Sequence, residues 1–406
     1  MDAYHILILL CGLVIFSYLF DVFAKRTRIP SVILLLGLGI GLRVLVDQWH
    51  FAVPDLQRIL PTLGTVGLIL IVFEGALELT YDRSKNSLIR KSFGSALVII
   101  LLTTAGIATA LHYITHAGIQ ACIANAIPLS VVSSAVAIPS VAGLANRPKE
   151  FIVFESTFSD ILGIMLFNFV AINTTFGAEA FGDLGLLIVG VLLLSAVFSM
   201  ALLWLLRHLK HHVKSFLVIA ILVLVFAVGK QLHLSTLVVV LIFGMFLANA
   251  GQVTVPWFRE RFLYADFDED LDVLHKISRE SAFLIRTFFF IIFGFSFTFN
   301  PESRADFAMI AGSVVVLTYL IRAIILRSLF RIRLKPLLYV APRGLITILL
   351  YLSLPEHLKI GAVGLGVLFV TVVGTSVIMA IGLATGGRGE DVLKSEPEAG
   401  PVPEVM

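Results

Sequence analysis

Residues 127–143 read IPLSVVSSAVAIPSVAG, an apolar run that is interrupted by Pro128 and Pro139. A proline inside a helix leaves a backbone carbonyl without its usual donor. Lipid cannot satisfy such a carbonyl, whereas a protein-lined cavity or an ion can. A second apolar run, residues 336–354, is interrupted by PRG at 342–344. The sequence therefore predicts two broken transmembrane helices, with a pair of ordinary proline kinks as the alternative.

The composition places the whole chain in a bilayer. Hydrophobic residues make up 58% of the 406 residues and charged residues 14%, and the mean hydropathy is +1.00. These values lie outside the range of soluble domains. The net charge of +3 implies no nucleic-acid partner, because Lys and Arg sit in alternate short loops. Cys11 and Cys122 both lie in apolar runs and indicate neither a disulfide framework nor a cysteine metal site.

The chain offers thirteen apolar stretches for a hydrocarbon core about 30 Å thick, which takes roughly 20 residues per helix. Of the 30 Lys and Arg residues, 22 fall in one set of loops and 5 in the other, with Arg286, Arg322 and Arg343 inside spans. The positive-inside rule then predicts a multi-pass protein of the cell membrane with its N-terminus outside and its C-terminus cytoplasmic. The stretches are 4–23, 29–46, 62–80, 92–115, 118–144, 150–173, 184–206, 213–230, 234–250, 279–299, 306–327, 336–354 and 359–384.

Thirteen spans permit two six-helix repeats of opposite orientation within one membrane domain, residues 1–384. The repeats would cover residues 4–173 and 213–384, with 184–206 as the linker helix. The two broken spans correspond in this 6+1+6 arrangement. Paired broken helices at corresponding positions point to a site near the bilayer midplane.

Two segments are expected outside the spans. Residues 252–278 combine aromatic side chains with a following acidic run, and predict a short interfacial helix. Residues 385–406 are rich in Gly, Pro and Glu, and predict a short disordered cytoplasmic tail.

The run FESTFSD, residues 154–160, places ionisable groups inside a span, where each costs about 2.5–3.5 kcal/mol and is a functional candidate. At 100° per residue, Asp160 shares a helix face with Ser156 and Thr157. These oxygens predict half of a cage for a hard monovalent cation, Na⁺ or K⁺, and the broken span 118–144 could supply the rest. The candidate ion-binding residues are Asp160, Ser156, Thr157, Ser133 and Ser134.

Glu155 lies on a neighbouring face with Ser159, for which we predict an accessory role, and Glu155 is separated in role from the aspartate. A buried arginine stays charged and needs a carboxylate or several carbonyls. We therefore predict a structural or gating ion pair between Glu155 and either Arg286 or Arg343. Arg322 lies near the cytoplasmic end of its span and is expected to extend its charged end to the interface.

On these motifs the chain resembles the cation/proton antiporter superfamily, and more closely its sodium/proton exchanger branch with the NhaP-type bacterial antiporters. The similarity runs from about residue 5 to residue 384. The resemblance implies an antiporter fold of about thirteen helices with crossing broken helices, a homodimer, exchange of Na⁺, K⁺ or Li⁺ for H⁺ without a cofactor, and an accessory role for Glu74. The matching motifs are Ile29-Pro30, the run FEGALEL at 73–79, Glu155-Ser156 with Asp160, and Pro342-Arg343-Gly344.

Three departures from the family pattern leave the identity of the ion open. Ser159 stands where that branch usually has Asn before the aspartate. Ser133, Ser134 and Ala135 stand where a Thr-Asp-Pro run is usual, so one expected carboxylate is missing. Arg286 occupies a position where the eukaryotic exchangers are expected to carry an acid.

Three functional classes compete on the sequence. An ion-coupled symporter of a small organic solute would share the broken helices but would need a larger cavity. An intramembrane hydrolase would need a nucleophile with a base, and no span pairs a Ser with a His. A single aspartate also cannot form the acid pair of an aspartyl protease. We predict antiport and no enzymatic activity, by competition of one proton and one cation for Asp160, which makes the exchange electroneutral. Exchange of H⁺ for a monovalent cation in vesicles would separate these classes.

Overall fold

The computed structural model describes residues 3–27, 30–49, 60–79, 85–173, 178–208, 214–231, 236–297, 304–329 and 335–386, and these are all-helical. Three short 3-10 turns cover Ala250–Gln252, Leu337–Tyr339 and Glu356–Leu358. The α-helices are α1 (Ala3–Thr27), α2 (Ser31–Trp49), α3 (Leu60–Leu77), α4 (Asn86–Thr115), α5 (Ile119–Ser130), α6 (Ser134–Ser140), α7 (Asn146–Ile172), α8 (Ala178–His208), α9 (Lys214–Gln231), α10 (Thr236–Asn249), α11 (Pro256–Phe262), α12 (Phe267–Phe295), α13 (Arg304–Ser328), α14 (Leu345–Leu352) and α15 (Leu365–Thr385).

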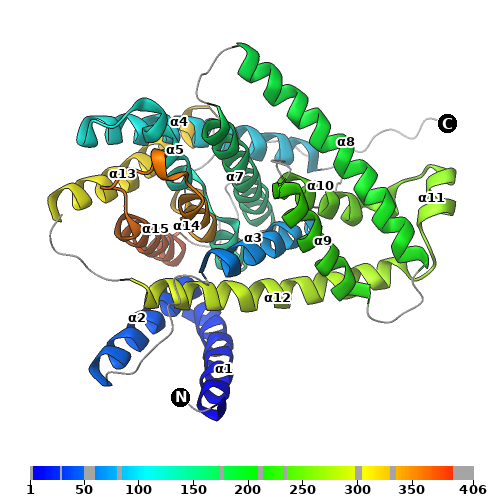
Figure 1. The fold of residues 1–406 in the computed structure, drawn as a ribbon, viewed down its shortest axis with the longest axis horizontal. Helices are drawn as coiled ribbons and strands as arrows, with labels where there is room; N and C mark the ends of the chain where they lie inside the picture. The colour runs from blue at the N-terminus through cyan, green and yellow to red at the C-terminus, as the bar shows by residue number, and fades with distance from the viewer. Residues whose placement is uncertain are drawn as a thin grey trace.

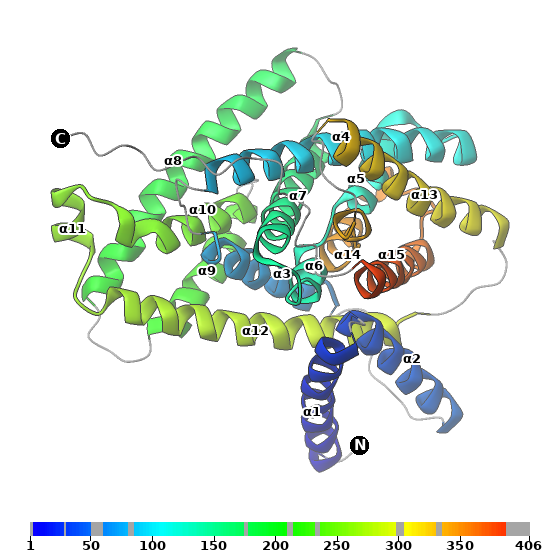
Figure 2. The ribbon, with the colours of Figure 1, turned by 180° about the vertical axis from the view of Figure 1, so that it is seen from behind.

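The helices pack in two groups (Figures 1 and 2). In the frame group, α12 packs along α2 and α3, and α10 packs between α3 and α8. In the crossing group, α4 packs against α5, α7 and α13, and α13 packs against α15. The groups meet where α3 contacts α7 and α14, and where α12 contacts α14. The polar groups described below lie in the crossing group and at its border with the frame group.

Glycines bring α2 and α12 into backbone contact within the frame group. A Cβ atom on Gly39 would overlap the backbone oxygen of Ile291, and one on Gly294 would meet the backbone of Leu36. Small residues permit this close approach between helices in a bilayer, where van der Waals packing replaces the hydrophobic effect. The two helices therefore form a tightly packed pair along one side of the protein.

Both predicted breaks are present, but the first does not coincide with its prolines. Pro128 lies inside α5 and Pro139 inside α6, and the extended residues 131–133 lie between them. The second run forms the 3-10 turn Leu337–Tyr339, then extended chain, then α14. The prolines weaken the helix, and the tertiary hydrogen bonds described below determine where it opens.

The number of membrane spans is only partly defined by the helices themselves. Six described helices are long and apolar enough to cross a membrane, and a seventh is possible if the bent pair Thr236–Gln252 and Pro256–Phe262, at 113°, counts as one span. The thirteen-span count, the repeats and the domain limits stay predictions. The predicted tail falls on residues 387–406, outside the described ranges, apart from its first two positions.

The predicted connection 252–278 is shorter than expected. Its short helix is present as α11, but α12 begins at Phe267 rather than near residue 279. The acidic residues Asp268, Glu269 and Asp270 form the first turn of α12. Negative charge is favourable at a helix N-terminus, so this acidic run begins a helix instead of forming a loop.

Candidate ion-binding site

Two non-helical segments, residues 131–133 and residues 340–344, meet inside the crossing group, and this contact is called the crossing below. The backbone nitrogen of Ser133 donates a hydrogen bond of 2.9 Å to the carbonyl of Pro342. A Cβ atom on Gly344 would lie 2.6 Å from the Ser133 hydroxyl oxygen. The crossing therefore depends on glycine at this position, which accounts for the last residue of the PRG run.

Neighbouring side chains satisfy the remaining backbone groups of the first segment. Arg343 Nη1 donates 2.9 Å to the carbonyl of Val131. The backbone nitrogen of Val132 donates 2.9 Å to the hydroxyl oxygen of Ser159. Buried backbone groups need such partners, so Ser159 on α7 serves as an anchor for the open segment. The sequence suggested only an accessory role for this serine.

Asp160 lies on α7 beside the N-terminus of α6, and its side chain is 3% exposed. Its Oδ2 accepts a hydrogen bond of 3.2 Å from the backbone nitrogen of Ser134. Its Oδ1 is buried and has no hydrogen-bond partner among the described residues. A buried carboxylate oxygen without a partner is strongly unfavourable unless a proton or a cation neutralises the group.

The predicted hydroxyl ligands lie on α7, which carries this aspartate, and on the segment next to α6. Ser156 Oγ donates 2.8 Å to the carbonyl of Ile152, and Thr157 Oγ1 donates 2.8 Å to that of Val153, one turn before Asp160. Each hydroxyl donates its hydrogen to the helix backbone, so the lone pairs of its oxygen remain available to coordinate a cation. On the crossing segment, the Ser133 hydroxyl is buried without a hydrogen-bond partner among the described residues.

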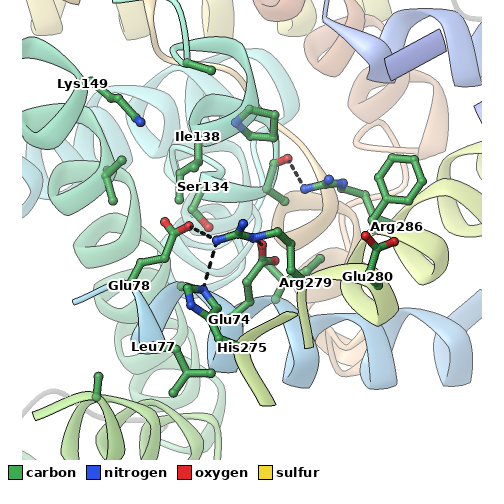
Figure 3. Close-up of a pocket in the computed structure, with 18 of the residues that line it drawn as sticks. Glu74, Leu77, Glu78, Ser134, Ile138, Lys149, His275, Arg279, Glu280 and Arg286 are labelled. Carbon is green, nitrogen blue, oxygen red and sulfur yellow. Dashed lines mark hydrogen bonds and ion pairs between the residues drawn. The ribbon is translucent and has the colours of Figure 1, made fainter. Parts of the chain in front are cut away.

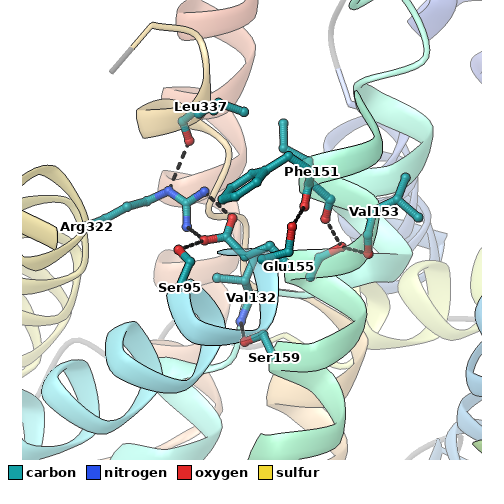
Figure 4. A network of polar contacts seen from close by, with 11 residues as sticks. Ser95, Val132, Phe151, Val153, Glu155, Ser159, Arg322 and Leu337 are labelled. Carbon is teal, nitrogen blue, oxygen red and sulfur yellow. Dashed lines mark hydrogen bonds and ion pairs between the residues drawn. The ribbon is translucent and has the colours of Figure 1, made fainter. Parts of the chain in front are cut away.

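Glu155 lies in a hydrogen-bonded network with Arg322, Ser95 and the carbonyl of Leu337 (Figure 4). Arg322 Nη1 and Nη2 donate to its two carboxylate oxygens at 3.1 and 2.6 Å. Ser95 donates a third hydrogen bond at 2.6 Å, and Arg322 Nε donates 3.0 Å to the carbonyl of Leu337. The arginine side chain is 0% exposed and the glutamate 2%. Glu155 is therefore a buried, fully paired carboxylate.

The predicted partners of Glu155 were wrong, and so was the prediction that Arg322 extends to the interface. The guanidinium instead joins α13 to α7 in the interior. Sequence position could not decide among three arginines, because the choice depends on how α13 and α7 both pack against α4. The useful signal was that Arg322, like the other two, lies inside a predicted span, where a bidentate carboxylate partner can compensate its charge.

The other two arginines predicted inside spans, Arg343 and Arg286, bind backbone carbonyls. Arg343 donates to Thr318 Oγ1 at 2.8 Å in addition to Val131, and so clamps the crossing to α13. Arg286 on α12 donates 2.9 Å to the carbonyl of Ala135 on α6. Arg286 thus links the frame group to the crossing group, directly beside the aspartate site.

A cavity of about 890 Å³ leads from the protein surface toward the site. Ser134 and Ala135, next to the aspartate, are among its lining residues, so it reaches the N-terminus of α6. Its walls come from α3 and α12 on the frame side and from α6 and α7 on the crossing side. Lys85, Lys149 and Arg279 lie in the wall, and all three belong to the predicted cytoplasmic set.

Acidic groups on α3 line this cavity together with an arginine (Figure 3). Arg279 lies 3.9 Å from Glu74 and 3.6 Å from Glu78. Glu74, predicted as an accessory residue, is therefore part of the access route and is not among the polar contacts of the aspartate. Glu78 and Arg279 were not among the predicted site residues, although Glu74 and Glu78 are four residues apart and share one helix face.

Comparisons with known proteins agree with this architecture. A protein-family model described as sodium/hydrogen exchanger, transmembrane, matches residues 9–385. No curated protein sequence matches the chain significantly. Two structures of the sodium proton antiporter MjNhaP1 from Methanocaldococcus jannaschii are similar: one at pH 8 (TM-score 0.71, 18% identity, 94% of this chain and 100% of that chain) and an electron-microscopy map (TM-score 0.69, 18% identity, 94% and 95%). The chain is a multi-pass membrane protein and belongs to the sodium/hydrogen exchanger family.

Proposed function

We propose that this protein is a secondary antiporter that exchanges one monovalent cation for one proton at Asp160. Na⁺ is the first candidate, with K⁺ and Li⁺ as alternatives. The observation that carries the proposal is the buried Oδ1 of Asp160, which has no hydrogen-bond partner among the described residues and lies beside the inner end of a cavity. A proton or a cation would each neutralise this carboxylate, and the two would exclude each other.

The pairing of Glu155 supports a single exchanging group. Glu155 is the other carboxylate buried on α7, and its charge is compensated by Arg322. Protonation of Glu155 would leave the buried guanidinium of Arg322 without a countercharge, which is strongly unfavourable. One alternating carboxylate implies that each cycle carries one cation in one direction and one proton in the other.

The oxygen ligands available around Asp160 suit a hard cation. Carboxylate, hydroxyl and carbonyl oxygens are the ligands that such ions prefer. The site would combine Asp160 with the hydroxyls of Ser156 and Thr157 and with those of Ser133 and Ser134. The missing second acid makes this cage less negative than a two-acid site, and the number of neutral oxygens would determine which cation binds.

We also propose the membrane organisation that the sequence predicts. Thirteen spans in two inverted repeats would place the N-terminus outside the cell and the C-terminus in the cytoplasm. The protein would lie in the plasma membrane as a homodimer. In that orientation the basic residues at the cavity mouth are cytoplasmic, so this structure would face inward.

Reconstituted protein tests the proposed function directly. A pH gradient is set across proteoliposomes, and Na⁺, K⁺ or Li⁺ is then added while the gradient is followed with a pH-sensitive dye. We expect at least one of these cations to dissipate the gradient, with choline as the inactive control. Dissipation that requires an organic solute would instead favour a symporter, and no response to any cation would contradict the proposal.

Replacing Ser156 with alanine should weaken cation binding without stopping transport. The change removes one neutral oxygen among several, so we expect the half-saturating cation concentration to rise severalfold with a similar maximal rate. Ser313→Ala is the matched control, because Ser313 Oγ also donates to its own helix backbone, at 2.8 Å, but on α13. An unchanged half-saturation for every cation would exclude Ser156 as a ligand.

Exchange should be insensitive to membrane potential. One cation for one proton moves no net charge, so we expect equal rates when the potential is clamped at different values with valinomycin and K⁺, using Na⁺ or Li⁺ as the test ion. A rate that changes severalfold with potential, or a steady current on a solid-supported membrane, would show that a second acid also releases its proton.

A further inference from the structure

On the frame side of the cavity, basic side chains on α12 face acidic side chains at α3. His275, Arg279 and Arg286 recur at intervals of four and seven residues on α12, and all three line the cavity. Such spacing places them on one helix face. Glu74 and Glu78 face them from α3 and the residue just beyond it. An entering cation therefore passes a row of acids that is already faced by arginines.

Arg279 is held loosely between those acids. Its distances of 3.9 Å to Glu74 and 3.6 Å to Glu78 exceed those of direct hydrogen bonds. The arginine side chain is 55% exposed, so solvent screens both pairs. Arg279 Nη2 also lies 3.3 Å from Nε2 of His275. An arginine can only donate, so this histidine nitrogen is the acceptor.

We propose that Arg279 is a tethered cation that determines access to the ion site. Its guanidinium occupies the Glu74–Glu78 pair when no ion is present, and an entering monovalent cation must compete with it for the same carboxylates. The loose geometry makes this competition possible, because a tightly paired arginine would simply neutralise the acids. Arg279 thereby lowers the apparent cation affinity without contacting Asp160. This inference rests on the proposed function and assigns a control step to its access route.

Cation exchange tests the predicted effect of Arg279 on the apparent cation affinity. In Arg279→Gln the acid pair loses its tethered competitor, so the half-saturating Na⁺ or Li⁺ concentration should fall about threefold at low ionic strength, where the Debye length is roughly 30 Å. Added choline chloride should shrink the difference, since screening weakens the field. Arg279→Lys keeps the charge and should resemble the unchanged protein. Arg259→Gln is the control, because Arg259 is exposed on α11 and does not line the cavity.

Glu78→Gln separates the electrostatic role from a structural one. Removing this acid should raise the half-saturating concentration, and adding Arg279→Gln to it should then have little further effect. Contacting residues that act through one another show this non-additivity. If Arg279 merely held α12 to α3, each change would lower the maximal rate instead, and an unchanged half-saturation in Arg279→Gln would overturn the proposal.

A chemical measurement tests the inference without relying on exchange. Ile138 lines the cavity one turn beyond Ser134 on α6. With Cys11 and Cys122 replaced by serine, Ile138→Cys offers one thiol to a positively charged and to a neutral methanethiosulfonate reagent. Arg279→Gln should raise the ratio of the two modification rates about threefold at low ionic strength, because only the charged reagent senses the guanidinium.

The two measurements distinguish an error in the proposed function from an error in the proposed access role of Arg279. Protein without any exchange but with a raised modification ratio would contradict the proposed function and retain the access role of Arg279. Exchange with an unchanged ratio and an unchanged half-saturation would retain the function and overturn the access role.

Discussion

Asp160→Asn should abolish exchange in both directions, to the level of protein-free vesicles, while the protein folds and inserts normally. The amide is neutral and close in size to the carboxylate, and it can still accept the hydrogen bond from the Ser134 backbone. It can neither release a proton nor compensate a cation, so neither half of the cycle can proceed. Dissipation of a preset pH gradient by Na⁺, K⁺ or Li⁺ measures the loss.

Asp47→Asn is the matched control for this loss. Asp47 is exposed on α2 and forms an ion pair of 2.9 Å with Arg43 one turn away, so its replacement removes the same charge far from the crossing. We expect normal exchange in this variant and normal elution of both variants from a gel-filtration column. Substantial exchange by folded Asp160→Asn would exclude Asp160 as the proton and cation carrier.

Glu155→Gln should destabilise the protein by about 3–5 kcal/mol, because it leaves Arg322 buried without a countercharge. The guanidinium is 0% exposed and the amide can satisfy only part of its hydrogen bonding. Thermal unfolding in detergent, followed by intrinsic fluorescence, measures the change. Glu150→Gln is the comparison, since its pair with Lys85 is about one third exposed and should contribute about 1 kcal/mol or less.

A double variant distinguishes the loss of compensation from a general packing defect. Glu155→Gln combined with Arg322→Met removes the stranded charge, and replacing a whole buried pair is often nearly neutral. We therefore expect the double variant to unfold at a higher temperature than Glu155→Gln alone. A single variant as stable as Glu150→Gln would contradict the assignment of the Glu155 pair as a structural element.

The sequence predicted those parts of the fold that depend on local chemistry. Pro342 with Gly344 predicted a break, which the described structure contains. Asp160, Ser156 and Thr157 were predicted to share a helix face, and all three are buried on α7. The partner of Glu155 could not be predicted, since Arg322, Arg343 and Arg286 all lie inside predicted spans. The packing of both α13 and α7 against α4 brings Arg322 to Glu155.

The position of α12 shows a second limit of sequence reasoning. The charged residues before its apolar half were interpreted as a connection, because low hydropathy excluded them from a span. They continue the helix, so that His275 lies on the same helix as Arg279, which faces Glu74 on α3, and Arg286, which contacts α6. Hydropathy detects contact with lipid and does not detect a helix wall that faces a water-filled cavity.

The crossing of the two open segments also limits where the protein can bend. The backbone bond between Ser133 and Pro342 and the side-chain bond of Arg343 to the Val131 carbonyl connect the two segments. A hinge at either break would have to sever these bonds in a buried setting, so the breaks move together as one stiff unit. If Asp160 exchanges ions with both sides of the membrane as proposed, this unit would have to slide past α3 and α12. The linkage between Arg286 and Ala135 would be remade at each stroke.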